Sequence, residues 1–336
     1  MHQTLVENRG GSHGVSETYL ETTAALEEKI AEAAQDAYFY HKLLNGIYYQ
    51  SLAQMDTNPE CKKIVEVLER GLSNRMVRLQ RIDNSVLPIV SRDDLLVTPQ
   101  GEVILLEAEA IKVSGLGYPA LMEGFLRTLS VEKSSLIYKE IASEIKRRNC
   151  KTPIYFIVGK HDDFHLSDIL TIFSNLKELN IPVELLKLED LDYCVSNVSV
   201  KGVGNDGFEL PGGRKVKTLF CFPDQEKIAG GHLPSSPGID YLVNLYSGNA
   251  SGLIDVLLPP KPFLGSKAGR ALLFSNEFKE LVARVAKEMK IDLEKIKQVM
   301  PECCFLTGYE ALEDVTGYFF KLNMRSGNGG VISPGG

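Results

Sequence analysis

Residues 153–191 constrain the fold more than any other part of the sequence, because they predict a strand, a helix and a second strand in succession. The run TPIYFIVGK is β-branched and aromatic and is bounded by Pro153 and Gly159, which is typical of a buried strand. Helical periodicity follows, and then a second apolar run, IPVELLKLEDL. Parallel strands need a long crossover connection of this kind, usually a helix. The sequence therefore predicts an α/β fold with a parallel sheet.

Helical periodicity also marks the sequence on both sides of this unit. Apolar residues at helical spacing, uninterrupted by proline, predict a helix over residues 19–55, and a second helix over 59–71. Residues 87–111 indicate two strands with a turn at Thr98–Gly101. The run KAGRALLFSNEFKELVARVAKEM at residues 267–289 predicts one long helix.

Charge and cysteine usage argue against several classes of protein. The formal net charge of −7 is opposite in sign to the basic stripe of a general nucleic-acid binder, so we expect no nucleic-acid partner. No apolar run approaches the roughly 18 residues of a membrane span, and the first residues lack the pattern of a secretory signal. Six scattered cysteines form no CxxC pair, which is typical of reduced thiols. These features predict a soluble, cytoplasmic protein with no membrane partner.

Two carboxylates on the second strand are candidates for a metal site. Glu107 and Glu109 are two positions apart, so they project from the same face of a strand. Mg²⁺ is the natural partner of such a pair, because it is bound by one or two carboxylates together with nucleotide phosphates. The solvent face of an edge strand has the same pattern, so the spacing alone leaves both interpretations open.

The glycine-rich end of the sequence is a candidate phosphate loop. Lys321 ends a predicted strand, and the loop RSGNGG follows it. Glycines let backbone N–H groups approach a phosphate closely, and the lysine supplies a positive charge. A plain hairpin or linker has the same composition. Because the sequence stops inside a strand–loop–strand unit, we expect the native protein to continue past Gly336.

Two further segments contain candidate binding residues. The turn SGLGY at Ser114–Tyr118 could hold a substrate carboxylate through its N–H groups, or it is a simple tight turn. Ser266 caps a predicted helix whose first turns hold Lys267 and Arg270. Cations near a helix N-terminus oppose the macrodipole, and a bound anion would explain them. An exposed capped helix is the alternative.

The order of these elements resembles that of the ATP-grasp ligases of the glutathione synthetase and glutathionylspermidine synthetase type. The resemblance spans most of residues 75–336. The family motifs R-x-D, E-x-N, S-x-G, N/S-K and K-P…G-G-G are echoed at Arg92–Asp94, Glu107–Glu109, Ser114–Gly117, Ser266–Lys267 and Lys321–Gly330. Two positions depart from the pattern: Glu109 stands where the family usually has asparagine, and Leu322 replaces the proline after the lysine.

The resemblance implies a role for each matching residue, with ATP and Mg²⁺ as cofactors. Glu107 and Glu109 would bind Mg²⁺, and Arg92 would act in catalysis and contact the acyl substrate together with Ser114 and Gly115. The ATP phosphates would contact Lys267, Lys321, Ser326, Gly327, Gly329 and Gly330. The implied partners are a small-molecule carboxylate and an amine.

The resemblance also implies a domain plan. Residues 1–18 form a flexible N-terminus, and residues 19–150 contribute N-terminal helices and strands of the ATP-grasp and substrate region. Residues 151–262 form a Rossmann-like pre-ATP-grasp domain with a parallel sheet. Residues 263–336 begin a partial ATP-grasp nucleotide domain.

The implied function is that of an ATP- and Mg²⁺-dependent carboxylate–amine ligase, which forms an amide bond through an acyl phosphate. Two alternatives remain open at this point. One is a non-catalytic protein that binds a small peptide or a partner on the same scaffold. The other is an unrelated Rossmann-like enzyme, although the glycine fingerprint for a dinucleotide is missing. The amphipathic helix at 19–55 could form a homodimer surface or pack on its own domain.

Overall fold

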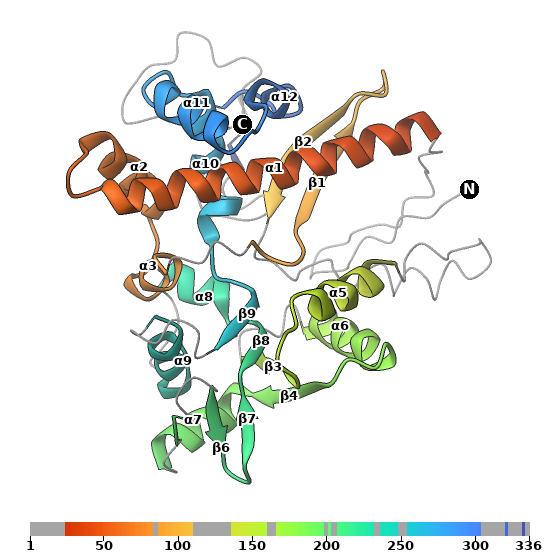
Figure 1. Cartoon of the computed structure of the whole chain (residues 1–336), viewed down its shortest axis with the longest axis vertical. Coiled ribbons are helices and arrows are strands. Elements are labelled where there is room, and N and C mark those ends of the chain that lie inside the picture. Colours follow the sequence, from red (N-terminus) through yellow and green to blue (C-terminus); the bar gives the residue numbers. More distant parts are fainter. Residues whose placement is uncertain are drawn as a thin grey trace.

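A computed structural model gives the fold of the chain (Figure 1). It describes residues 24–82, 87–109, 136–159, 166–197, 201–202, 207–231, 236–247, 254–303, 320–321 and 331–332. All structural statements below concern these residues.

A four-stranded parallel sheet confirms the predicted α/β fold class. Its strands are β3 (Ile154–Val158), β4 (Val183–Lys187), β8 (Thr218–Cys221) and β9 (Asp255–Leu258), in the order β4-β3-β8-β9. Helix α6 (Leu166–Glu178) connects β3 to β4, as the sequence predicts. Every neighbouring pair of strands in this sheet is parallel.

Alternation along the strands places helices on both faces of the sheet. Ile154 and Phe156 pack in one core with α6 and α5 (Leu136–Arg147). Tyr155 and Ile157, one position away, pack in a second core. That core includes α3 (Asn74–Gln80), α7 (Leu188–Asn197), α8 (Gln225–Gly230) and α9 (Pro237–Ser247). Because successive side chains of a strand point to opposite faces, the result is a sheet between two helical layers.

Short antiparallel pairs accompany the main sheet. Strands β5 (Lys201–Gly202), β6 (Phe208–Leu210) and β7 (Arg214–Val216) form a three-stranded sheet before β8. Near the C-terminus, β10 (Phe320–Lys321) pairs with β11 (Val331–Ile332). The last pair agrees with the strand–loop–strand pattern that the sequence predicts.

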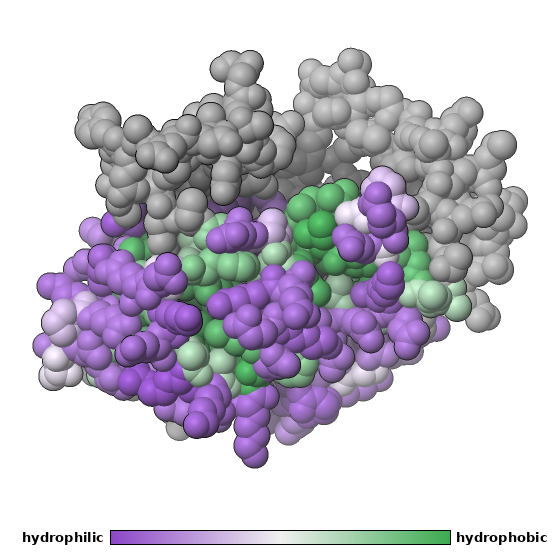
Figure 2. All heavy atoms as spheres, turned by 90° about the horizontal axis from the view of Figure 1, so that it is seen from above, coloured by the Kyte–Doolittle hydropathy of each residue, from purple (hydrophilic) through white to green (hydrophobic). Residues whose placement is uncertain are grey.

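A third core lies in a separate helical layer, at the top of Figure 1. Its centre is the long helix α1 (Ala24–Gln54), of which Tyr40, Leu44 and Ile47 are almost fully buried within the chain. Around it pack α2 (Pro59–Glu69), the 3₁₀ turn η3 (Pro262–Gly265), α10 (Lys267–Phe274), α11 (Lys279–Glu288) and α12 (Leu293–Gln298). The hairpin of β1 (Arg92–Val97) and β2 (Val103–Glu109) lies against the same helix. Figure 2 shows this side of the molecule, with hydrophilic side chains over much of the described surface and hydrophobic patches between them.

The predicted single helix over residues 267–289 is wrong, because the structure has two helices there. Helix α10 ends at Phe274 with Ser275 as its C-cap, and α11 begins at Lys279. Serine and asparagine compete with the helix by bonding to nearby backbone groups, and Ser275-Asn276 stands at the break. The break lets both helices pack against the α1 layer.

Within the described residues, none of the helices is both long and apolar enough to cross a bilayer. The domain boundaries at residues 18, 150 and 262 stay predictions. Helices α3 and α5 precede residue 151 and yet pack on the parallel sheet, while residues 263–300 pack with α1 and α2.

Candidate functional site

The β1–β2 hairpin gathers charged side chains on one face. In its antiparallel register Arg92 lies opposite Glu109, and Asp94 lies opposite Glu107. Residues directly opposite one another share a face of the sheet, as do residues two apart on one strand. Accordingly, Arg92 Nε lies 3.2 Å from Asp94 Oδ1. The hairpin therefore presents an arginine and at least two carboxylates together.

Lys267 joins this group from a different element. Its Nζ lies 3.6 Å from Glu107 Oε1, and both side chains are mostly buried, with exposed fractions of 23% and 20%. Lys267 occupies the first position of α10 because Ser266 is the N-cap, with its Oγ accepting a hydrogen bond from Gly269 N at 2.9 Å. The structure thus brings a predicted metal ligand and a predicted nucleotide-binding lysine into contact.

The opposite face of β1 fixes the hairpin to α1. Asp93 Oδ1 lies 3.2 Å from His41 Nε2, and Asp93 Oδ2 accepts a hydrogen bond from Ser91 Oγ at 2.9 Å. Next to this contact, burial raises the pKa of Tyr40, while the charge of Arg270 acts in the opposite direction. Asp93 is therefore a structural residue, and Arg92 and Asp94 on either side of it face the charged group.

The donor chemistry of this face fits Mg²⁺ and a nucleotide. Carboxylate oxygens of Asp94 and Glu107 are the ligands that Mg²⁺ prefers, and two protein carboxylates suffice when phosphates complete the shell. Three or more metal-binding side chains do not meet anywhere in the described part of the chain. The sequence did not predict Asp94 as a metal ligand, although the residue belongs to the R-x-D motif. Its position opposite Glu107 in the hairpin makes it a candidate metal ligand.

Several predicted site residues lie outside the described residues or are described only in their backbone. Ser114, Gly115, Ser326, Gly327, Gly329 and Gly330 lie outside them. Glu109 is placed by its backbone in β2, and Lys321 by its backbone in β10, opposite Val331. Their assignments to the acyl substrate, the metal and ATP stay predictions.

A second group of residues lies at the carboxyl edge of the parallel sheet. Strand β4, which follows β3 in the chain, lies on one side of β3 in the sheet, and β8 lies on its other side. The direction in which successive strands are added to the sheet therefore reverses between β3 and β8. Ligands of open α/β sheets bind at such a switch point, outside the carboxyl ends of the strands. Here Gly159 follows β3 and is in close contact with the buried side chain of Asp224, which follows β8. Only a glycine leaves room for that carboxylate.

Gln225 lies next to Asp224 and has an unsatisfied polar atom. Its side chain is only 8% exposed, and its Oε1 accepts no hydrogen bond from the described residues. A buried acceptor of this kind is costly unless a water or ligand satisfies it. Asp224 itself has a left-handed backbone, with a φ of 51°. Such strain often occurs at binding sites. Neither residue was predicted from the sequence, in which the available signal was an acidic residue shortly after the apolar run at residues 218–222.

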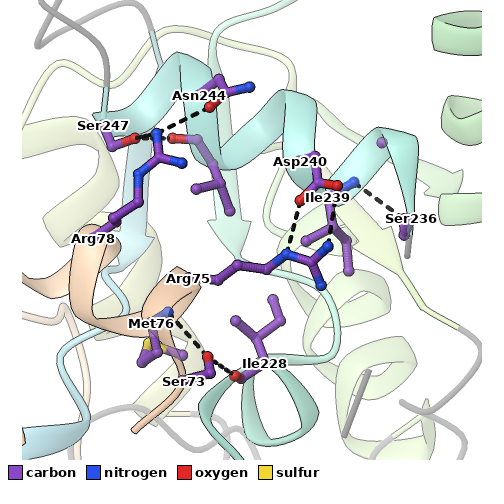
Figure 3. A network of polar contacts seen from close by, with 12 residues as sticks. Ser73, Arg75, Met76, Arg78, Ile228, Ser236, Ile239, Asp240, Asn244 and Ser247 are labelled. Atoms are coloured by element: carbon purple, nitrogen blue, oxygen red, sulfur yellow. Dashed lines mark hydrogen bonds and ion pairs between the residues drawn. The ribbon is translucent and has the colours of Figure 1, made fainter. Parts of the chain in front are cut away.

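Helix α3 holds α8 in place at this edge (Figure 3). Ser73 N donates to Ala229 O at 2.9 Å, and Ser73 Oγ donates to Ile228 O. Arg75 makes a two-pronged contact with Asp240 of α9, with Nε 2.8 Å from Oδ1 and a terminal nitrogen donating to Oδ2 at 3.1 Å. The position of Gln225, the first residue of α8, is therefore tied to α3 and α9.

Lys267 and the Gly159–Asp224 pair both follow strands of the parallel sheet in the chain. Strand β9 is parallel to β8 and ends at Leu258. From there the chain passes through η3 directly into α10, which begins with Lys267. Because parallel strands end at one edge, the α10 start and the Gly159–Asp224 contact both follow carboxyl ends of the sheet.

No family model matches the chain, and no curated protein matches its sequence. Among solved structures, the chain is similar to a glutathione synthetase-like effector from Globodera pallida in its apo form. The two are 12% identical and superpose with a TM-score of 0.49. The similarity covers 84% of this chain, which spans 61% of the length of the effector structure.

Proposed function

We propose that the chain is an ATP- and Mg²⁺-dependent carboxylate–amine ligase that forms an amide bond through an acyl phosphate. The observation that carries this proposal is the contact between Glu107 and Lys267. It joins the E-x-E strand to the S-K helix start, two motifs that are far apart in sequence. Charged side chains from distant segments, mostly buried around one point, are typical of a site for a charged ligand.

The hairpin residues have separate roles in the proposed reaction. Glu107 and Asp94 supply oxygens for Mg²⁺, with Glu109 as a further candidate from the same strand. Lys267, which lies 3.6 Å from Glu107, would supply a positive charge for nucleotide phosphate oxygens. Bound ATP supplies the phosphoryl group that activates the substrate carboxylate. Positioned cations near the developing phosphate charge are the main way in which a protein promotes phosphoryl transfer.

We assign to Arg92 the binding of the carboxylate that is activated. Its guanidinium is held by both oxygens of Asp94, at 3.2 Å and 3.4 Å. This contact orients the planar group, and a guanidinium binds carboxylates with paired hydrogen bonds. We assign Ser114 and Gly115 to the same substrate, and Lys321 with Ser326, Gly327, Gly329 and Gly330 to the ATP phosphates.

We assign the amine substrate to the carboxyl edge of the sheet. An amine carries N–H donors, and Gln225 Oε1 is a buried acceptor without a described partner at that edge. The Asp224 carboxylate beside it favours a positively charged group. After activation, the bound ammonium would lose a proton, its nitrogen would attack the acyl carbon, phosphate would leave, and loss of a second proton from nitrogen would give the amide.

Calorimetric titration of ATP, with and without Mg²⁺, tests the nucleotide site. We expect wild-type protein to bind ATP only weakly in EDTA and at least about tenfold more tightly with Mg²⁺, a difference of about 1.4 kcal/mol. Glu107→Gln should abolish the Mg²⁺ enhancement, because the variant keeps the size of the side chain and loses the charge. Lys267→Met should weaken binding under both conditions.

The pair Lys62 and Glu66 provides a matched control. Lys62 Nζ lies 3.9 Å from Glu66 Oε1, close to the 3.6 Å of the Lys267–Glu107 pair, but both of these side chains are exposed on α2. Glu66→Gln and Lys62→Met should leave ATP binding unchanged. Binding that is independent of Mg²⁺ and equal in all variants would contradict the proposal. Tight binding of a small peptide, without any binding of ATP, would favour the non-catalytic alternative.

A further inference from the structure

A groove separates α1 from α5, and Ser91, which donates to Asp93, is one of its lining residues. Its volume is about 1180 Å³, and its walls come from α1, from residues 87–91 and from α5, with Met289 at one end. It includes neither Arg92, Glu107 nor Lys267 among its lining residues. Pockets for small molecules usually have volumes of about 300–1,000 Å³, so this groove has room for one.

Apolar and aromatic side chains form much of the lining. Aromatic rings come from α1 and aliphatic side chains from the other two walls: Tyr38, Tyr49, Ile89, Val90, Ile137 and Ile141. The Tyr38 ring is 52% exposed and lies edge-on to the ring of Phe39. The groove therefore favours a ligand with a flat or alkyl body.

The charges around the groove favour an anion. Lys42 lines it, is half-buried, and forms no ion pair with any described residue. Glu144 is neutralised, because Arg147 and Arg148 both donate to its carboxylate at 2.6 Å. Hydrogen bonding from Arg147 first, and then from Arg148, lowers the pKa of Glu144 to about 2. Glu140, which is exposed, is the other acidic lining residue.

A further positive charge lies directly behind the lining. Lys261 is 1% exposed, and its Nζ donates to Asn45 Oδ1 at 2.8 Å while lying 4.8 Å from the centre of the Tyr49 ring. Asn45 and Tyr49 both line the groove. In a chain with a net charge of −7, this groove combines apolar walls with a local excess of positive charge.

We propose that the groove binds a small amphipathic anion, a carboxylate or sulfonate on an aromatic or alkyl body. The acid group contacts Lys42, and the apolar body packs on Tyr49 and Ile141. The proposal is independent of the ligase function, because it uses none of the residues assigned to ATP, metal or substrate.

Fluorescence titration with 8-anilinonaphthalene-1-sulfonate tests the proposal, since this probe has an aromatic body and a sulfonate. We expect saturable binding at one site. Lys42→Met keeps the apolar stem but removes the charge, and should weaken binding about tenfold. Glu140→Gln removes an opposing charge, and should strengthen binding about twofold.

Lys62→Met on α2 is the control for a general loss of positive charge, and it should bind the probe like wild type. Thermal melts of all variants establish that each is folded. Equal binding by wild type and Lys42→Met, weaker binding by Glu140→Gln, or no saturable binding at all would each overturn the proposal.

Discussion

At the scale of single residues, the environment of Glu144 strongly favours the charged form of its carboxylate. Two arginines hold its carboxylate, and the lowered pKa of about 2 compares with an ordinary value of 4.5. A carboxylate whose pKa is lower in the folded state stabilises the fold above its unfolded pKa. That contribution is lost as the pH falls through the folded pKa.

We therefore predict that Glu144→Gln lowers the free energy of unfolding at pH 6 by about 1 kcal/mol, allowing for solvent screening of a partly exposed pair. The difference between variant and wild type should shrink as the pH falls from 4.5 towards the folded pKa of about 2. Urea denaturation at pH 6 and pH 2.5 measures it. The exposed Glu66→Gln variant should show no comparable change, and a Glu144→Gln effect as large at pH 2.5 as at pH 6 would exclude the charge as its cause.

Some of the site residues could be predicted from the sequence, and others could not. The spacing of Glu107 and Glu109 was visible as an i, i+2 pattern, and the structure adds that Glu107 contacts Lys267. Gln225 could not be identified, because its distinguishing property is an unsatisfied buried oxygen, which depends on tertiary contacts and not on local pattern. Asp94 required the register of the hairpin, which the sequence does not specify.

At the scale of elements, α10 is placed by a close approach to α1. Gly269 lies on α10, and a Cβ at this position would clash with Leu44 and lie 3.1 Å from both Phe263 O and Tyr40 Oη. A backbone oxygen cannot move aside as a flexible side chain can. The close approach fixes the helix whose first residue, Lys267, contacts Glu107.

We predict that Gly269→Ala destabilises the fold by about 1–3 kcal/mol, although alanine is normally the better helix former. Gly46 on α1 is the matched control. A Cβ there would meet the end of the Met289 side chain, which is flexible and can shift. Urea denaturation should show a clearly smaller effect for Gly46→Ala. Equal effects, or stabilisation by Gly269→Ala, would contradict the proposed packing.

Elements with strong local signals were predicted well. The β-branched run at β3 and the periodicity of α6 need no tertiary information, and both occur as predicted. The break between α10 and α11 was missed because apolar periodicity continues on both sides of Ser275-Asn276. Packing on α1 decides that the chain stops and restarts its helix there.

At the scale of the whole molecule, the predicted parallel sheet is present, but elements that pack together in space come from distant parts of the sequence. Helices α3 and α5 come before the sheet in the chain and cover opposite faces of it. Helices α10 and α11 come after the sheet and pack with α1. Periodicity shows which residues of a helix are apolar, but not which distant element they meet. For this reason the strand and helix content could be predicted, and the three cores could not.

This arrangement places the candidate site where the layers meet. The hairpin is fixed to α1, Lys267 follows the carboxyl end of β9, and Gln225 follows that of β8. A ligand bound by all three would contact both the helical layer and the sheet. We therefore propose that ATP with Mg²⁺ binds at the hairpin and the start of α10.

Hydrogen–deuterium exchange with and without ATP and Mg²⁺ tests this claim most directly. We predict slower exchange in peptides that cover residues 92–97, 103–109 and 267–274, and no change in β6 and β7, which lie at the bottom of Figure 1, away from the hairpin. The protection should be lost in Glu107→Gln. Protection that is absent from the hairpin and α10, or that is the same in Glu107→Gln as in wild type, would contradict the account.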